Sequence, residues 1–294
     1  MTPLIIVGCG YLGSHLARVA LAEGRTVRVC ARSTGRLAPL GALGAQVKYL
    51  DVAVPKQLPV ALSGLPGATV IYAVPPDSKL RPGQAVTAAM QAAYGGGAGC
   101  FILFSSSGLY GDRPDDESWI DESSDLANDD PPMANVKSDE EAVARCDIDR
   151  LRTITLRLAP VYGPGRGIRA RMRKGDYRII DDGEHAISRI YIDDLVQVIA
   201  TVEDRGVSRS LYLVADDEPT TQGEYARWLS ARLGLPMPAS RPLYDAGGAQ
   251  VAHRNRKIRN TKLKAELGIT LRYPTFRDGE VAIEATEAAI EAPN

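Results

Sequence analysis

The hydrophobic residues of this chain fall into short apolar runs, with amphipathic stretches between them. The first run, Leu4–Val7, is apolar and mostly β-branched, and the sequence GCGYLG and an amphipathic pattern follow it. This order predicts a buried strand, a turn and a helix. The unbroken run at residues 100–104 is typical of a strand with both faces buried. Further strands are expected at residues 46–52, 68–76 and 211–215, and residues 26–33 are expected to form a strand and its exit loop.

Strands that alternate with helices predict a doubly wound, parallel α/β sheet of the Rossmann type. We expect residues 1–162 to form a dinucleotide-binding domain, which residues 189–217 complete. Residues 163–188 and 218–294 are expected to form a smaller, mainly helical C-terminal lobe that binds the substrate. In this lobe, residues 221–224 have the spacing of a capping box that opens a helix.

Composition excludes some classes of partner. Of 294 residues, 45% are hydrophobic and 24% are charged, and the net charge is -1. No overall field therefore attracts nucleic acid or an anionic membrane. The first strand begins directly after Pro3 and no apolar run is long enough to span a bilayer, so we expect a cytoplasmic protein. The 4 cysteines fit core positions in a reducing compartment, and 3 scattered histidines predict no metal site.

The glycines of the first loop have the spacing of a dinucleotide-binding loop. Gly8 permits a tight turn, Gly10 lets backbone N–H groups approach a pyrophosphate, and Gly13 lets the helix pack closely on the strand. The start of the helix then faces the phosphates. The residues predicted to line this loop are Gly8, Cys9, Gly10, Tyr11, Leu12 and Gly13.

The residue that follows the second strand favours NADP(H) over NAD(H). An acidic side chain at this place would bind the ribose hydroxyls of NAD, whereas an arginine accommodates a 2′-phosphate. The chain has Arg32 and Ser33 here and no acid. The alternative interpretation is a solvated arginine on a surface loop. The other predicted cofactor contacts are Asp51 and Val52 at the adenine, and Ala73, Val74, Pro75 and Ser105 at the ends of later strands.

Four motifs together resemble a known superfamily. They are GCGYLGSHLA at residues 8–17, FSSSGLYG at 104–111, RLAPVYGPG at 157–165 and IYIDDL at 190–195. The chain resembles the extended short-chain dehydrogenase/reductase superfamily, in particular the NAD-dependent epimerase/dehydratase family and its atypical members. The likeness extends from residue 4 to the region of Tyr273. The glycine loop departs from the usual GxxGxxG spacing, as it does in divergent members.

The resemblance implies a serine that polarises the substrate and a Tyr-x-x-x-Lys pair. The serine maps to Ser106, with Ser107 as the alternative, and the lysine that holds the nicotinamide ribose maps to Lys137. Met133 stands where the tyrosine is expected. A thioether has no transferable proton. Because positioned acid–base catalysis contributes about 100- to 10,000-fold, this exchange removes about 3–5 kcal/mol of barrier lowering unless another group replaces it.

Three hypotheses follow from this departure. The one we favour is a reductase or dehydrogenase acting on a small polar metabolite with a keto, imine or sugar-like group, in which Lys137, Ser106, water or the substrate supplies the proton. The second is an epimerase or dehydratase in which the nicotinamide acts transiently. The third is a regulatory or scaffold protein that binds NADP(H) without turnover. The partner is expected to be a small molecule, not nucleic acid or a membrane, and a homodimer stays open.

Several further residues are candidates for binding. The resemblance implies that Ala159, Pro160 and Val161 orient the nicotinamide, and Ser107, Tyr110 and Arg189 are candidate substrate contacts. In the acidic loop at residues 112–130, Glu122 or Asp129 could replace the missing acid, although most such carboxylates are solvated. The cationic run at residues 166–174 could clamp a phosphate or carboxylate, but a solvated helix is favoured.

Overall fold

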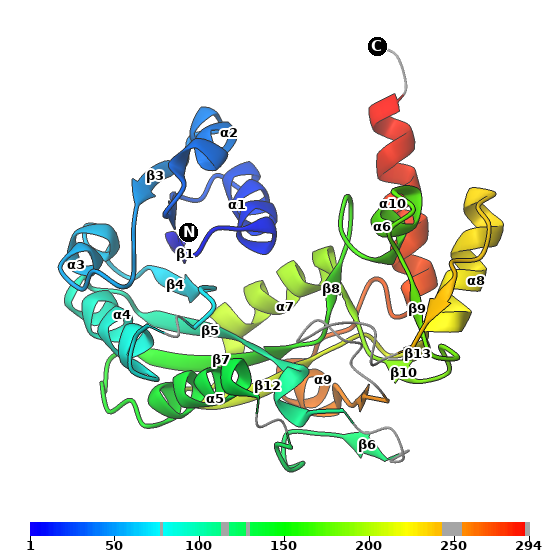
Figure 1. The fold of residues 1–294 in the computed structure, drawn as a ribbon. Coiled ribbons are helices and arrows are strands. Elements are labelled where there is room, and N and C mark those ends of the chain that lie inside the picture. The colour runs from blue at the N-terminus through cyan, green and yellow to red at the C-terminus, as the bar shows by residue number, and fades with distance from the viewer. Residues whose placement is uncertain (77–78, 113–117, 128–129, 243–254, 292–294) are drawn as a thin grey trace. The chain divides into compact units, whose positions relative to one another are not determined.

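The computed structural model describes residues 1–76, 79–112, 118–127, 130–242 and 255–291 (Figure 1). The chain divides into two compact units. Unit 1 contains residues 1–109, 129–157 and 199–212, and unit 2 contains residues 110–128, 158–198 and 213–294.

A seven-stranded sheet in the order β12-β7-β5-β4-β1-β2-β3 is the centre of the fold. Its strands are β1 (Leu4–Val7), β2 (Val27–Ala31), β3 (Gln46–Tyr49), β4 (Thr69–Tyr72), β5 (Cys100–Ser106), β7 (Arg152–Leu158) and β12 (Ser210–Val214). β1 pairs in parallel with β2 on one side and with β4 on the other. The strand order therefore reverses at β1, and ligands of such sheets bind beyond the carboxyl ends of the strands at this reversal. The predicted doubly wound α/β fold is confirmed.

Two strands are shorter than the apolar runs suggested. β3 ends at Tyr49, because the carboxylate of Asp51 accepts the N–H of Ala53 at 3.0 Å and forms a turn. β4 ends at Tyr72, three residues before the first proline of a Pro-Pro pair that cannot donate to a strand ladder. The expected strands at 46–52 and 68–76 are therefore wrong at their C-terminal ends.

Unit 1 carries helices on its sheet, and their packing explains the apolar runs. They are α1 (Tyr11–Ala22), η1 (Thr34–Leu37), α2 (Ala38–Ala42), α3 (Gln57–Leu62), α4 (Gln84–Gly95) and α5 (Pro131–Ala144). Two further helices, η2 (Ser107–Tyr110) and α7 (Ile192–Arg205), belong partly to each unit. Ile5 and Val7 belong to one core cluster with Tyr72, Phe101 and residues of α3, α4 and α5. The rings of Tyr72 and Phe101 stack, with their centroids 5.9 Å apart. Ile6, on the opposite face of β1, is also fully buried.

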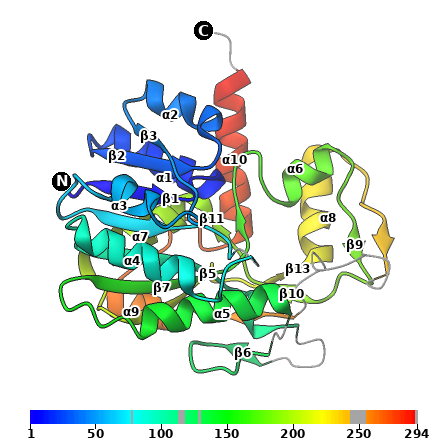
Figure 2. The same ribbon diagram turned by 60° about the vertical axis from the view of Figure 1, so that its left-hand side comes forward.

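Helices α4 and α5 lie side by side in unit 1 (Figure 2), and one buried carboxyl group joins them. Burial raises the pKa of Asp139 on α5 to about 6, although the N–H of Gly83, the residue before α4, donates to its carboxylate. A carboxyl group whose pKa is higher in the folded than in the unfolded chain stabilises the fold below its unfolded pKa. That contribution is lost as the pH rises through its folded pKa.

Asp139→Asn is therefore expected to stabilise the protein by about 1–2 kcal/mol at about pH 8, and by about half as much at about pH 5. The asparagine keeps an oxygen that can accept the N–H of Gly83 but carries no buried charge. Urea unfolding at both pH values measures the difference. The control is Asp149→Asn at an exposed carboxylate, which should show no such pH dependence. If Asp139→Asn raised the free energy of unfolding equally at both pH values, burial of the Asp139 charge would not be the cause.

Unit 2 contains the helices α6 (Ile168–Arg173), α8 (Gln222–Leu233), α9 (Thr261–Leu267) and α10 (Phe276–Glu291). Short strand pairs join its loops: β8 (Val161–Tyr162) with β11 (Ile190–Tyr191), β10 (Ala186–Ile187) with β13 (Thr220–Thr221), β14 (Ser240–Arg241) with β9 (Ile179–Ile180), and β15 (Lys257–Ile258) with β6 (Trp119–Ile120). Thr221 caps α8, since its Oγ1 accepts the N–H of Glu224 at 3.1 Å. This bond confirms one half of the predicted capping box.

The cationic run at residues 166–174 is not simply a solvated helix. Arg169 of α6 is 4% exposed, and its guanidinium binds the carboxylates of Glu280, Glu284 and Glu287 on α10. The favoured interpretation was therefore wrong for Arg169. This arginine does bind carboxylates, but they belong to the chain itself, more than a hundred residues later in the sequence.

Candidate cofactor and active site

The loop between β1 and α1 has the close packing that its glycines predict. Gly8 has a φ of 84°, and a Cβ atom added there would lie 2.7 Å from the carbonyl oxygen of Ala73, just after β4. A Cβ atom on Gly13 would lie 2.9 Å from Cγ2 of Ile6, so α1 packs directly on β1. The tight turn at Gly8 and the close helix packing at Gly13 are therefore confirmed.

Gly10 differs from these two glycines because the space beside it is open. Apart from Gly10 and its two neighbours in the chain, no heavy atom of the described residues lies within 4 Å of a Cβ atom added to Gly10. Gly10 is the N-cap residue of α1; no side chain caps this helix end, and its first turn holds no acidic residue. The start of a helix carries a partial positive charge and outward-pointing N–H groups. The geometry at Gly10 therefore fits a phosphate group.

The loop after β2 carries positive charge. Arg32 and Ser33 follow the last residue of β2, and both side chains are exposed. Ser33 precedes the short helix η1, and its hydroxyl makes no capping bond to that helix. The segment from Arg32 to Arg36 contains two arginines and no acidic residue. An anion can approach this loop without meeting a carboxylate from the same segment.

The other predicted cofactor residues of unit 1 follow β3 and β4. Val74 lies against the glycine loop, with its Cγ2 2.8 Å from a Cβ atom added to Gly8. Asp51 is held in place by its own turn, and its N–H donates to Oε1 of Gln57 at 2.9 Å. Val52 is half-buried and Pro75 is exposed. The structure thus brings Ala73 and Val74 to the loop, whereas the binding roles of Asp51, Val52 and Pro75 stay predictions.

The three serines after the apolar part of β5 have different surroundings. Ser105 is buried, and its hydroxyl donates to the carboxylate of Glu140 on α5. Ser106 is half-buried, and its Oγ accepts the N–H of Gly108 at 3.0 Å, so its own O–H can donate elsewhere. Ser107 is only 1% exposed. Exposure and hydrogen bonding thus favour Ser106 over Ser107 as the group that meets a substrate.

Helix α5 carries the two positions mapped to the Tyr-x-x-x-Lys pair. Met133 is half-buried and Lys137 is exposed, while Asp139 and Glu140 are buried. The helix leads from β5 back to β7, so it runs antiparallel to the strands and its first turns lie near their carboxyl ends. The sequence mapping of Met133 and Lys137 onto the start of this helix fits that topology.

The candidate substrate contacts of unit 2 are engaged within that unit. Tyr110 is fully buried, and its hydroxyl donates to the carbonyl oxygen of Asp121 at 3.0 Å. Arg189 is buried over the ring of Tyr225 at 4.5 Å, and its Nη1 donates to two backbone carbonyls. Oε1 of Glu122 accepts the N–H of Leu213 at 2.9 Å. Asp129, the other candidate acid, lies outside the described residues.

The nicotinamide-orienting segment predicted at residues 159–161 follows β7 directly. The N–H of Ala159 donates to the carbonyl of Val214 at 2.9 Å, and the carbonyl of Pro160 accepts the N–H of Ile190 at 3.1 Å. Val161 begins β8, which pairs with β11. Backbone bonds therefore fix this segment directly after β7, and its role in orienting a nicotinamide stays a prediction.

A comparison with protein families decides the relationship. The model of the NAD dependent epimerase/dehydratase family matches residues 4–215. The chain belongs to this family. Comparison with curated proteins gives no match.

Solved structures agree with this membership over nearly the whole chain. A functionally unknown conserved protein from Silicibacter pomeroyi is 26% identical, with a TM-score of 0.79 over 97% of this chain and 99% of that chain. UDP-glucose 4-epimerase from Thermotoga maritima, solved with UDP-glucose, is 20% identical, with a TM-score of 0.82 over 99% of this chain and 100% of that chain. The dTDP-glucose 4,6-dehydratase DesIV from Streptomyces venezuelae, solved with NAD, is 20% identical, with a TM-score of 0.81 over 98% and 97%. The latter two likenesses show the fold.

This epimerase/dehydratase family member has a buried polar group that the sequence analysis missed. Glu140 binds both Ser105 on β5 and Arg157 on β7, and all three side chains are less than 10% exposed. The sequence feature that indicates this buried group is Arg157, because a charged side chain inside the buried run of β7 needs an acidic partner. The sequence alone did not identify which of the many acidic residues is that partner.

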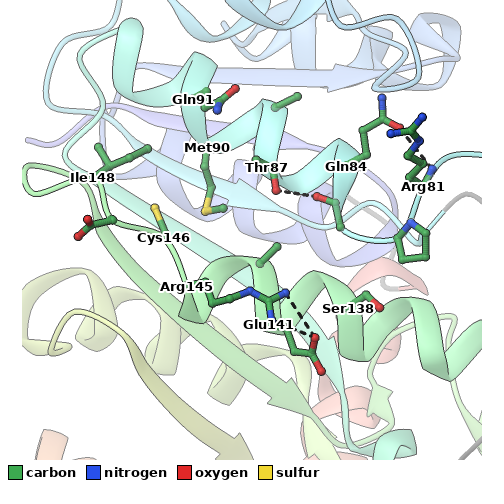
Figure 3. A pocket seen from close by; sticks show the side chains of 15 residues that line it. Arg81, Gln84, Thr87, Met90, Gln91, Ser138, Glu141, Arg145, Cys146 and Ile148 are labelled. Carbon is green, nitrogen blue, oxygen red and sulfur yellow. Dashed lines mark hydrogen bonds and ion pairs between the residues drawn. The ribbon is translucent and has the colours of Figure 1, made fainter.

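A hollow in unit 1 of this family member lies apart from the glycine loop. It is a pocket of about 700 Å³ lined by residues of both α4 and α5 (Figure 3), with Met90 and Cys146 among its lining residues. Arg145 and Glu141 of α5 form an ion pair at its edge. Of the described residues that line it, none belongs to the glycine loop or to the other predicted cofactor contacts. This pocket is therefore not the predicted dinucleotide site.

The described residues contain neither a helix fit to span a membrane nor a cluster of metal-binding side chains. None of the helices in the described ranges combines the length and apolar character that a bilayer span needs. Within the same ranges, no group of three or more His, Cys, Asp or Glu side chains could hold a metal ion.

Proposed function

We propose that the protein is an NADP(H)-dependent oxidoreductase that acts on a small polar metabolite with a keto, imine or sugar-like group. The observation that carries the proposal is the open cradle at Gly10, where α1 begins without a capping side chain and without an acid in its first turn. A pyrophosphate placed there meets outward-pointing N–H groups and the positive end of the helix. Family membership supports the choice of a nicotinamide dinucleotide.

The preference for NADP(H) rests on Arg32. Its exposed guanidinium follows β2 directly, at the position where this fold holds the adenine ribose. A 2′-phosphate at this place would form charge-assisted hydrogen bonds with the guanidinium. NADH lacks this phosphate and would gain nothing from the arginine.

The proposed roles of the reacting groups follow from their surroundings. The bound dinucleotide supplies or accepts a hydride. Ser106 would donate its O–H to the substrate heteroatom, because its oxygen already accepts the N–H of Gly108. Lys137 would hold the nicotinamide ribose, and residues 158–161 would orient the ring. Met133 supplies no proton, so the proton would come from Lys137, water or the substrate itself, and an iminium substrate needs none.

A second candidate is an NADP(H)-binding regulatory or scaffold protein, and the observation in its favour is Met133. If Met133 takes the place of the family's tyrosine, as the resemblance implies, the site would lack the phenol that the resemblance implies for acid–base chemistry. The third candidate, an epimerase or dehydratase, is supported by the family and by relatives such as the epimerase solved with UDP-glucose. Consumption of NADPH with carbonyl or imine substrates would separate the first candidate from these two.

Replacing Arg32 by alanine is expected to weaken NADPH binding by about 10- to 100-fold, the loss of one charge-assisted contact to a phosphate. NADH binding should change by less than about twofold, because NADH has no 2′-phosphate. Titration calorimetry with both dinucleotides measures this. The control is Arg18→Ala, which removes an exposed arginine from α1. Equal binding of NADPH and NADH by the wild-type chain would overturn the role given to Arg32.

A further inference from the structure

Three buried polar side chains form a hydrogen-bonded group near the carboxyl ends of β5 and β7. The hydroxyl of Ser105 donates to Oε1 of Glu140. Arg157 donates from Nε to Oε1 of Glu140 at 2.9 Å and from Nη2 to Oε2 at 2.6 Å. The three residues are 8%, 6% and 7% exposed in chain order. Both oxygens of the Glu140 carboxylate are therefore bound inside the protein.

This group joins three elements that carry parts of the proposed site. Ser105 belongs to β5, Arg157 belongs to the neighbouring strand β7, and Glu140 belongs to α5. A buried ion pair adds little net stability compared with apolar side chains of the same volume. A buried ion pair instead fixes the relative orientation of its two side chains, because the two parallel N–H bonds of a guanidinium hold a carboxylate in one orientation. Glu140 therefore fixes α5 against the ends of both strands.

The position of Glu140 on α5 links it to the candidate site residues. Met133 precedes Glu140 by seven residues, which is about two helical turns, so both lie on the same stripe of the helix. Lys137 precedes Glu140 by three residues and lies on the adjoining face. Ser106 directly follows Ser105, the other partner of Glu140. A shift of Glu140 would therefore move α5 and the end of β5 together.

We propose that Glu140 is a positioning residue for the nicotinamide end of the dinucleotide site, an inference that rests on the function proposed above. Through Ser105 it holds Ser106, and through its place on α5 it holds Lys137. The glycine loop and Arg32 belong to β1, α1 and the end of β2, none of which Glu140 contacts through these bonds. Loss of the Glu140 bonds should therefore weaken contacts to the nicotinamide half and spare those to the adenine half.

The experiment compares two ligands that differ in the nicotinamide half. NADPH contains both halves, whereas 2′,5′-ADP contains only the adenine half with its 2′-phosphate. Ser105→Ala and Glu140→Gln are expected to weaken NADPH binding by about 3- to 10-fold, the loss of one or two oriented contacts, and to change 2′,5′-ADP binding by less than about twofold. Ser105→Thr, which keeps the hydroxyl, should bind NADPH like the wild type.

The matched control is Glu141→Gln on the same helix. Glu141 is the next residue, but its carboxylate is partly exposed and pairs with the exposed Arg145 at 3.4 Å. The same chemical change there should leave the affinities for both ligands unaltered. If Glu140→Gln does not fold, the double variant Glu140→Leu/Arg157→Met replaces the ion pair by apolar side chains of similar size. This variant should show the same selective loss of NADPH affinity.

Two results would overturn the inference in different ways. If the variants lose affinity for NADPH and 2′,5′-ADP equally, or for neither, Glu140 is a structural residue only, and the proposed function still stands. If the wild-type chain binds neither ligand, the proposed function fails and the inference fails with it.

Discussion

Replacing Gly10 by aspartate is expected to weaken dinucleotide binding by more than about 100-fold while the fold keeps its stability. The carboxylate would stand at the start of α1, where the pyrophosphate is proposed to bind, and would both fill the space and repel the phosphates. The space beside Gly10 is open among the described residues, so the new side chain displaces nothing. Since Gly10 is the N-cap residue of α1, aspartate should even stabilise the helix end.

A loss of dinucleotide binding without a loss of stability distinguishes an effect on the binding site from an effect on folding. Calorimetric titration with NADPH and a thermal melt of the unliganded chain measure the two effects on one sample. Gly10→Asn is the matched control, because asparagine also caps a helix and has nearly the same volume but carries no charge. It should bind NADPH more tightly than Gly10→Asp does. Unchanged NADPH affinity in Gly10→Asp would show that the phosphates bind elsewhere and would remove the main support for the proposed function.

The glycine loop was predictable because its chemistry is local. Gly8, Gly10 and Gly13 lie within six residues, and the strand before them and the helix after them are set by neighbouring residues. The positive φ of Gly8 and the contact of Gly13 with Ile6 are consequences of that short segment. The parallel sheet was predictable as well, since strands that alternate with helices along the chain allow few arrangements.

The buried ion pairs were not predictable in the same way. Arg157 and Glu140 are 17 residues apart, and Arg169 and Glu280 are 111 residues apart. The hydrophobic pattern identifies which face of a helix is buried, but it does not choose among the many acidic residues that could meet a buried arginine. The cationic run at residues 166–174 was misjudged for this reason. When charged residues are spread around a short helix, the sequence predicts an exposed helix, and a buried face is recognised only once the partner helix is known.

Arg169 is expected to be the most important single charge for the stability of unit 2. Its guanidinium lies 3.3 Å from Oε2 of Glu280, which is 1% exposed, and it also binds Glu284 and Glu287. Burial raises the pKa of Glu280, while the hydroxyl of Tyr225 and the guanidinium of Arg169 lower it. The ionised form of Glu280 thus depends on these two partners. Without Arg169, the hydrogen-bond partner of this carboxylate within the described part of the chain would be the O–H of Tyr225 at 2.5 Å.

Arg169→Ala is therefore expected to lower the free energy of unfolding by about 3–5 kcal/mol, the cost of leaving a buried carboxylate without its cation. Urea unfolding at neutral pH measures it. The matched control is Arg173→Ala on the same helix, because the Arg173 side chain is 46% exposed and its guanidinium binds Glu287 at 2.9 Å. That change should cost less than about 1 kcal/mol, because water screens an exposed pair. Equal losses for the two variants would mean that water reaches Glu280. Arg169→Met combined with Glu280→Leu should recover part of the lost stability, because it leaves no buried carboxylate without its cation, while Glu284 and Glu287 keep Arg232 and Arg173. The recovery should be incomplete, because the buried O–H of Tyr225 loses Glu280 as its acceptor.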